Sequence, residues 1–317
     1  MTKKEALQLI KRMQEKADWI DLAMDELQEL IKEKEFEFAR TFIDVFVDKL
    51  ETQDNQVLSS PKNKQLLADL DRIYASLKIS ITSKITIQMV KDMNYILSEN
   101  TAYYGSLKSS LSNKMFKVTA EQIKGIVYSR LGMKPDGTLI KEGYMDGLLE
   151  MPEVRTKIKD FAYRGVLTQS GFEGFKNGFK ELIQGEPEKL GAFSKYHRNM
   201  AYDTYSQVDA MQGKIYSEEL QLKYFIYNGG IIKNSRAFCI KRAGKVFTTK
   251  ETESWENDPE NTAKPPNYDP LINRGGYGCR HSIDYITEAM AKVLRPDLKE
   301  TIEKETKKQN YSFNNKY

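Results

Sequence analysis

Hydrophobic side chains recur at two interleaved heptad positions in the first thirty or so residues. The first set is Ala6, Met13, Ile20 and Leu27, and the second is Ile10, Ala17, Met24 and Ile31. The alternating spacings of three and four place both sets on one face of a helix. The pattern predicts an N-terminal amphipathic helix that packs either on its own domain or on a neighbouring subunit. Alanine and methionine are weak choices for a tight two-stranded zipper.

The helical pattern continues through a bulkier, phenylalanine-rich segment as far as Leu50. Polar and turn-forming residues at Asp54–Gln56 and Ser59–Pro61 then interrupt it. Residues 63–111 return to helical periodicity. β-branched residues alternate over 79–87 within this stretch and would also suit a short strand. We predict helix there because the flanking periodicity is helical.

Turn and helix-start signals divide the middle of the chain. Pro135-Asp136-Gly137 predicts a tight turn, and Met151-Pro152-Glu153 predicts a helix start with proline in the first turn. Glycines at 171, 174 and 178 interleave with phenylalanines, which indicates close approach of backbones. A long helix is expected over residues 193–222.

The pattern changes after residue 222. We expect a strand over Lys223–Ile226, a turn at Asn228-Gly229-Gly230, more strand at Ile231-Ile232 and a last strand ending at Ile286. Helix returns from Glu288. The predicted fold class is α+β, with a mostly helical N-terminal body and a small C-terminal module containing a short antiparallel sheet. The expected organisation is an amphipathic helical segment at 1–50, a helical body at 51–220 and the α+β module at 221–317.

Composition narrows the class of protein. Hydrophobic residues make up 40% and charged residues 30% of the 317 residues, and the net charge is only +4. This balance is typical of a globular, helix-rich protein and does not require a nucleic-acid partner. No apolar run is long enough to span a membrane, so no membrane partner is expected, and no secretory signal is visible. Two cysteines fit a reducing compartment.

Several short motifs follow one another in the C-terminal third. Ser235-Arg236-Ala237-Phe238-Cys239 is followed by Gly244-Lys245-Val246-Phe247 and by a loop with Pro265-Pro266. The series ends in Gly278-Cys279-Arg280-His281, directly before the last predicted strand. Upstream, a helix carries Arg198, Ala201 and Thr204.

This ordered series, over about residues 195–286, resembles the C-terminal signature of the phage Mu F-like minor head proteins. Two positions depart from the commoner pattern. Cys239 has no Cys-x-x-Cys partner, and His281 stands where many relatives have cysteine. The N-terminal two thirds carry no motif of that family.

The resemblance implies a structural minor head protein of a tailed bacteriophage, made in the host cytoplasm and located in the virion head near the portal. Its implied partners are the portal and capsid proteins, and its implied role is support of head morphogenesis and of DNA packaging or delivery. Catalysis is not expected. The rival functions are a nuclease or ADP-ribosyltransferase-like enzyme and a DNA-binding adaptor. An enzyme of that kind would need a further domain, and only about thirty residues follow His281.

Cys239, Cys279 and His281 are candidate ligands for a metal ion, and zinc is the ion that best suits them. Zinc prefers four ligands in tetrahedral geometry, with thiolate and imidazole favoured. Cys279 and His281 are two residues apart, so on a strand they share one face, and Cys239 would approach from a neighbouring strand. A fourth ligand would be Asp269, another carboxylate, a carbonyl or water.

Three other interpretations of these residues stay open. Cys239 can pack as a small hydrophobic residue while His281 bonds a carbonyl. The two cysteines can form a disulfide after cell lysis. A Cys279–His281 nucleophilic pair is the least favoured, because no oxyanion-stabilising element is evident.

Residues 155–198 contain nine basic and five acidic residues, interleaved with aromatic side chains. This composition suits weak contact with packaged DNA. It suits equally a helix with a basic solvent face and an aromatic core.

Overall fold

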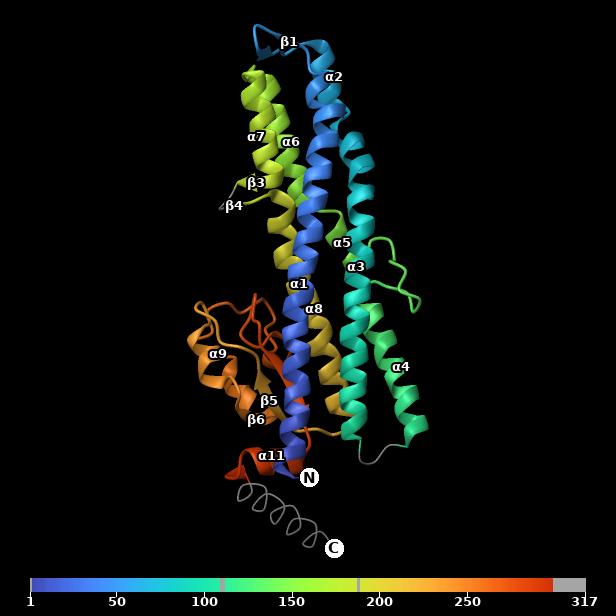
Figure 1. Cartoon of the computed structure of the whole chain (residues 1–317), viewed down its shortest axis with the longest axis vertical. Helices are drawn as coiled ribbons and strands as arrows, with labels where there is room; N and C mark the ends of the chain where they lie inside the picture. Colours follow the sequence, from blue (N-terminus) through green and yellow to red (C-terminus); the bar gives the residue numbers. More distant parts are fainter. Residues whose placement is uncertain (1, 109–111, 187–188, 299–317) are drawn as a thin grey trace, which may run out of the picture. The chain divides into compact units, whose positions relative to one another are not determined.

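The computed structural model describes residues 2–108, 112–186 and 189–298, without the side chains of residues 80, 148, 197–200 and 202. The protein is mostly helical, with a small antiparallel sheet near the C-terminus, as the sequence predicted (Figure 1). The described helices are α1 (Lys3–Val45), α2 (Pro61–Ala68), α3 (Leu70–Leu107), α4 (Asn113–Arg130), α5 (Tyr144–Leu149), α6 (Pro152–Leu167), α7 (Phe172–Gln184), α8 (Ala192–Glu219), α9 (Ala237–Arg242), α10 (Pro270–Asn273) and α11 (Glu288–Leu294). The short 3-10 helices are η1 (Val47–Lys49) and η2 (Thr249–Trp255).

The strands form three small antiparallel sheets. Two are hairpins, β1 (Thr52–Gln53) with β2 (Gln56–Val57), and β3 (Gly185–Glu186) with β4 (Lys189–Leu190). The third has the order β6-β5-β7, built from β5 (Tyr224–Asn228), β6 (Val246–Thr248) and β7 (Ser282–Ile286).

Two compact units make up the chain, and neither is continuous in sequence. Unit 1 comprises Met1–Ile20, Tyr95–Val127 and Asp203–Tyr317, and unit 2 comprises Asp21–Asn94 and Tyr128–Tyr202. The sequence led us instead to expect three consecutive segments, at 1–50, 51–220 and 221–317. Consecutive segments do not describe these units, because the long helices α1 and α3 each contribute residues to both.

Helix α1 is a single helix through the predicted heptad region and the phenylalanine-rich segment that follows. Ala6, Met13 and Leu27 of the predicted stripe are 0–1% exposed. The stripe is therefore covered by other parts of the same chain, as in the first of the two arrangements considered. β-branched residues 79–87 lie in helix α3, as predicted.

Aromatic packing builds the core of unit 2. Phe42 of α1 stacks on Phe179 of α7 with ring centroids 4.5 Å apart, and Phe38 contacts Phe193 at the start of α8. Gly165 of α6 lies against the Phe175 ring, where an added Cβ would come within 2.2 Å of it. Of the three glycines in the predicted pattern, Gly178 lies against an aromatic ring, with an added Cβ 3.1 Å from Phe161, whereas an added Cβ at Gly174 would meet nothing within 4 Å.

Local signals fix several helix ends in unit 2. The Ser60 side chain accepts the Asn63 N–H and Pro61 opens helix α2. Proline also opens α6, at the predicted Met151-Pro152 boundary. Gly137 has φ +86° in the predicted turn, and the flanking residues Met133 and Leu139 form an antiparallel bridge.

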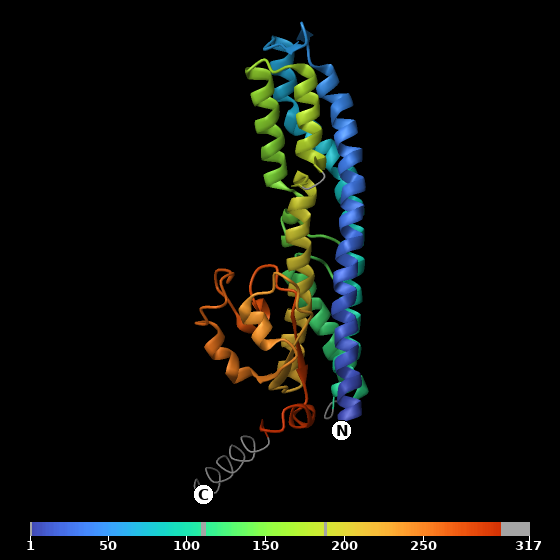
Figure 2. The same cartoon turned by 60° about the vertical axis from the view of Figure 1, so that its left-hand side comes forward.

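The three-stranded sheet of unit 1 has β5 at its centre, and Figures 1 and 2 show it beside the lower part of α8. Tyr227 of β5 pairs with Ile283 of β7, and Phe225 pairs with Tyr285. The rings of Phe225, Tyr227 and Phe238 pack edge-on against Trp255. This aromatic cluster anchors the loops that surround the sheet.

The predicted strand at Ile231-Ile232 is wrong. Neither residue lies in a strand, and their side chains are 57% and 45% exposed. Gly229 adopts φ +134°, and its N–H bonds the Asn228 side chain, so the backbone leaves the sheet there.

A buried charge cluster joins α1 to the rest of unit 1. The Lys16 ammonium donates to Asp209 Oδ1 at 2.6 Å, to Asn100 Oδ1 at 2.9 Å and to Asp284 Oδ1 at 3.2 Å. Asp284 also accepts bonds from Ser282 and Asn228. Every one of these residues is buried, so the N-terminal part of α1 is fixed by ionic contacts as well as by its apolar stripe.

None of the helices in the described part of the chain combines the length and the apolar character that a membrane crossing needs.

Candidate metal centre

Cys239, Cys279 and His281 come from two segments that are far apart in the sequence. Cys239 lies on helix α9, and Cys279 and His281 lie in the loop that leads directly into β7. The prediction that Cys239 lies on a strand is therefore wrong, and Cys279 and His281 precede the strand on which they were expected. The prediction that the three residues converge is confirmed.

The three ligand atoms form a tight group. Cys239 Sγ and Cys279 Sγ are 3.8 Å apart, Cys279 Sγ and His281 Nδ1 are 3.8 Å apart, and all three atoms lie within 4.8 Å of one another. Both cysteines are free thiols, so the structure contains no disulfide between them. In a tetrahedral zinc site, neighbouring ligand atoms lie about 3.5–3.8 Å apart, since Zn–S is about 2.3 Å and Zn–N about 2.0 Å. The separations of the two sulfurs from each other and of Cys279 Sγ from His281 Nδ1 match that geometry closely.

Glycine at position 275 makes room for the two sulfurs. A Cβ at Gly275 would come within 2.5 Å of Cys239 Sγ and 3.0 Å of Cys279 Sγ. The Gly275 N–H donates to Cys279 Sγ at 3.3 Å. Backbone donors of this kind stabilise sulfur as a thiolate, the form that binds metal.

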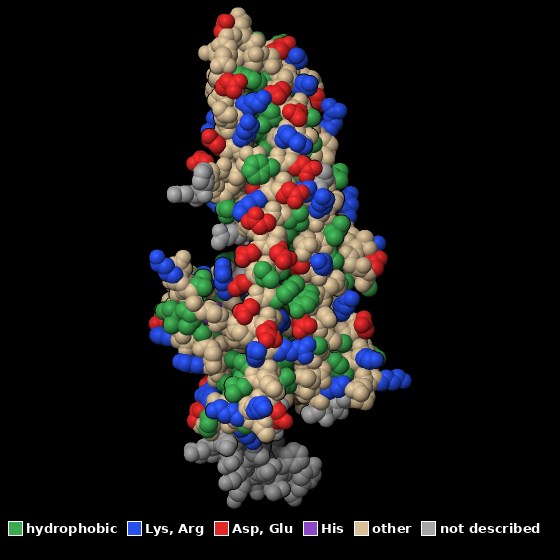
Figure 3. Space-filling view, viewed as in Figure 1, with side chains coloured by type: hydrophobic (Ala, Val, Ile, Leu, Met, Phe, Trp, Pro, Cys, Tyr) green, Lys and Arg blue, Asp and Glu red, His purple; other side chains and the backbone are tan. Residues whose placement is uncertain are grey.

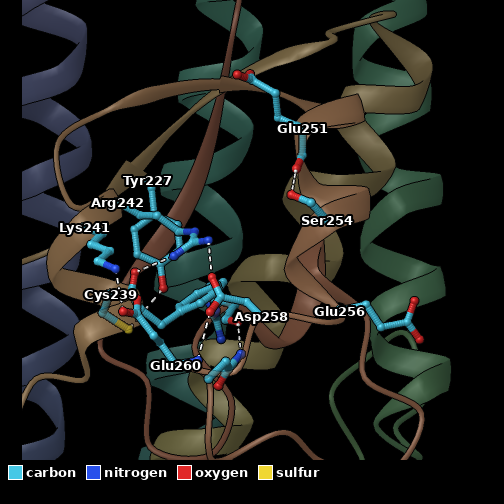
Figure 4. Close-up of polar contacts among 12 residues, drawn as sticks. Tyr227, Cys239, Lys241, Arg242, Glu251, Ser254, Glu256, Asp258 and Glu260 are labelled. Carbon is cyan, nitrogen blue, oxygen red and sulfur yellow. Dashed lines mark hydrogen bonds and ion pairs between the residues drawn. The ribbon is translucent and has the colours of Figure 1, made fainter.

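Arg236 and the aromatic cluster hold the loop that carries these residues. The Arg236 guanidinium donates to the carbonyl oxygens of Gly275, at 3.0 Å, and of Tyr277, at 2.6 Å. The Tyr227 hydroxyl lies 3.3 Å from Cys239 Sγ and 3.5 Å from Cys279 Sγ, and Figure 4 shows Tyr227 and Cys239 at this site. On α9, Arg242 lies over the Phe238 ring and pairs with Asp258 at 2.6 Å. The motif residues therefore also serve to brace the site.

Hydrogen bonds set the charge state of the sulfurs. The contact with Cys239 lowers the pKa of the Cys279 thiol, and bonds to His281 and Tyr227 and the charge of Arg274 act in the same direction. The same Cys239–Cys279 contact, together with burial, raises the pKa of Cys239. Ionisation is thus easier at Cys279 than at Cys239. A divalent cation would favour the thiolate at both positions.

His281 faces the sulfurs through Nδ1, while its ring stacks on Tyr227 with centroids 5.0 Å apart. Its Nε2 is buried, and no hydrogen-bond partner for it exists among the described residues. A hydrogen bond to the Cys279 sulfur uses a proton on Nδ1, whereas ligation of an ion through Nδ1 would require the neutral tautomer with its proton on Nε2.

Asp269 does not join the group. One of its carboxylate oxygens accepts the Leu271 N–H at the start of α10, and the other pairs with Lys214 at 2.7 Å. In the described part of the chain no further cysteine, histidine or acidic residue belongs to the cluster. Of the helix residues in the motif series, Ala201 and Thr204 are buried on α8, whereas the side chain of Arg198 lies outside the described residues.

Burial decides against nucleophilic chemistry. Cys239, Cys279 and His281 are only 2–4% exposed, so a substrate would not reach the sulfur. The chemistry that fits this group is ligation of an ion that ties α9 to β7.

The basic segment 155–198 is partly neutralised by its neighbours in unit 2. Arg155 and Lys159 both bind Asp71, and Lys176 binds Asp48. On the face drawn in Figure 3, basic and acidic side chains are interspersed. This arrangement is typical of a solvated charged surface rather than a continuous phosphate-binding track.

No match was found to any protein-family model, curated protein or solved structure.

Proposed function

We propose that this protein is a structural component of a tailed-phage head, and that a zinc ion bound by Cys239, Cys279 and His281 fastens its C-terminal module. The observation that carries the proposal is the convergence of the separated motif residues on one buried site. Two sulfurs and one imidazole nitrogen meet there with the spacing that a tetrahedral ion requires.

A structural zinc suits the architecture of this module. The sheet has only three strands, and β6 has three residues. An ion that joins α9 to the segment before β7 would close the long connection between them.

The proposed location and partners rest on the resemblance of the motifs to those of phage head proteins. In the virion, the chain is assembled with portal and capsid proteins near the portal, and it supports head morphogenesis and DNA packaging or delivery. A rigid C-terminal module would serve as an anchor, and the long helices would supply contact surfaces.

Metal analysis of the full chain tests the zinc proposal. Protein expressed in zinc-supplemented medium should carry about one zinc per chain by plasma emission spectrometry. A Cys279→Ala/His281→Ala variant should lose that zinc, and a Ser254→Ala control on the nearby η2 should keep it. Wild-type protein that carries no zinc and takes none up would overturn the proposal.

Assembly in the phage tests the structural role. Heads purified from a host infected with the phage that encodes this chain should contain it, and deletion of its gene should reduce packaged DNA. Absence of the chain from purified heads would refute the head assignment and leave the zinc site untouched. Nuclease and NAD-consumption assays of the purified chain should show no activity above the Cys279→Ala/His281→Ala control. Turnover lost in that control would favour the enzymatic rival.

A further inference from the structure

A fourth polar atom lies at the cysteine and histidine site. Tyr227 Oη is 3.3 Å from Cys239 Sγ and 3.5 Å from Cys279 Sγ. Tyr227 is fully buried, and among the described residues its hydroxyl has hydrogen-bond contacts with the two sulfurs alone. The hydroxyl therefore points at the space that the sulfurs share.

The distances from this oxygen are those of a metal ligand. With Zn–S of about 2.3 Å and Zn–O of about 2.0 Å, tetrahedral angles put oxygen and sulfur about 3.5 Å apart. The separation of the two sulfurs and that of Cys279 Sγ from His281 Nδ1, both 3.8 Å, are also close to those of neighbouring ligands in a tetrahedral site. The four separations measured among these donor atoms are therefore each compatible with neighbouring positions in one tetrahedral site.

We propose that Tyr227 supplies the fourth ligand, so that the ion is held by two sulfurs, one nitrogen and one phenolate oxygen. This inference rests on the zinc site proposed above and extends it to a residue outside the motif series. On binding, the two thiols and the phenol each release one proton to the solvent. His281 contributes its unprotonated nitrogen.

The fold positions Tyr227 without help from an ion. β5 is the central strand, and Tyr227 pairs with Ile283 on β7. Its ring stacks on His281 and meets Phe238 and Trp255 edge-on. Such packing restricts the ring to one orientation, which is the preorganisation that a metal site needs.

Positive charge nearby would balance a third anionic ligand. A zinc ion with two thiolates and one phenolate carries one net negative charge. Arg274 is buried, its charge lowers the pKa of Cys279, and two of its N–H groups donate to Ser206 on α8. Its guanidinium is the positive charge that would offset part of the anionic charge of the site.

The test compares the full chain, freed of metal by a chelator, with Tyr227→Phe and Tyr285→Phe. Phenylalanine keeps the ring packing at position 227. Tyr285 is a matched control, since it is a buried tyrosine on the adjacent strand whose hydroxyl has no hydrogen-bond partner among the described residues. Zinc titration should produce the ultraviolet difference band of a tyrosinate in wild type and in Tyr285→Phe, and no such band in Tyr227→Phe. Zinc affinity should fall by about 10- to 100-fold in Tyr227→Phe alone.

The possible outcomes separate the two proposals. Zinc binding by wild type without a tyrosinate band would overturn ligation by Tyr227 and leave the cysteine and histidine site standing. A Tyr227→Phe variant that binds zinc as tightly as wild type would do the same. Failure of wild type to bind zinc at all would overturn both proposals.

Discussion

Cys239 Sγ and Cys279 Sγ lie 3.8 Å apart although the two residues are forty positions apart in the sequence. The intervening chain contains β6, η2, a proline-rich loop and α10, and its ends meet beside the central strand β5. Closing a connection of this length costs conformational entropy, so something must hold its ends. Strand pairing and aromatic packing supply part of that stabilisation, and a bound ion would supply more.

Removal of metal should destabilise the protein, whereas reduction should not. We expect a strong chelator to lower the melting temperature by several degrees, at about 2–4 °C for each kcal/mol lost. A thiol reductant should leave it unchanged, because both cysteines are free. Differential scanning calorimetry measures both effects. The opposite response, sensitivity to reductant alone, would indicate a disulfide, and no response to either would leave packing as the only role of the cysteines.

Gly275→Ala should disturb the site through a single added methyl group. Its Cβ would lie 2.5 Å from Cys239 Sγ, so the sulfur or the loop must shift. We expect a loss of about 1–3 kcal/mol in the free energy of unfolding, together with weaker zinc retention. Gly230→Ala is the control, because nothing lies within 4 Å of its added Cβ. Urea denaturation and metal analysis would compare the free energy of unfolding and the zinc content of the two variants. Equal values for both variants would show that the sulfurs tolerate displacement.

Lys16→Met should be among the most destabilising single changes on α1. It leaves the carboxylates of Asp209 and Asp284 buried without their cation, at a cost of about 3–5 kcal/mol. Lys11→Met is the matched control, since the Lys11 side chain is 78% exposed and pairs with the exposed Glu15 one turn away. Chemical denaturation measures the free energy of unfolding of both variants. A cost below about 1 kcal/mol for Lys16→Met would mean that the cluster contributes little.

Glu35 should make the stability of the protein depend on pH near neutrality. The carboxylate accepts the Ser194 N–H and hydroxyl, at 2.5 and 2.7 Å, but burial raises its pKa from 4.5 to about 7. Because the folded state holds the proton more tightly than the unfolded state, its contribution to stability is full below about pH 4.5 and declines as pH rises to about 7.

The variant Glu35→Gln removes this dependence while keeping an oxygen that can accept from Ser194. Above pH 7 we expect it to exceed wild type by on the order of 2 kcal/mol, and near pH 4.5 we expect little difference. Thermal unfolding measured from pH 4.5 to 8.5 would show this, with the exposed Glu26→Gln as control. A constant difference between variant and wild type across that range would contradict the assignment.

Local patterns in the sequence determined most of the helices and several of their ends. Heptad spacing predicted the buried face of α1, and the Met151-Pro152 pair predicted the start of α6. These features depend on residues within one or two turns of each other. The two-residue spacing of Cys279 and His281 predicted that they act together, although they lie in the loop before β7 and not on the strand.

Tertiary structure alone decided which distant residues meet. Cys239 reaches the site from a short helix, and Tyr227 reaches it through the register of β5 against β7, although Tyr227 stands in a strand whose pattern indicates only burial. Lys16 resembles the other charges of α1, yet it is the lysine that lies opposite Asp209 and Asp284. Conversely, Ile231 and Ile232 have strand-forming side chains, but the backbone turns away at Gly229. Periodicity encodes which face of an element is buried, whereas strand register and chain packing determine what that face contacts.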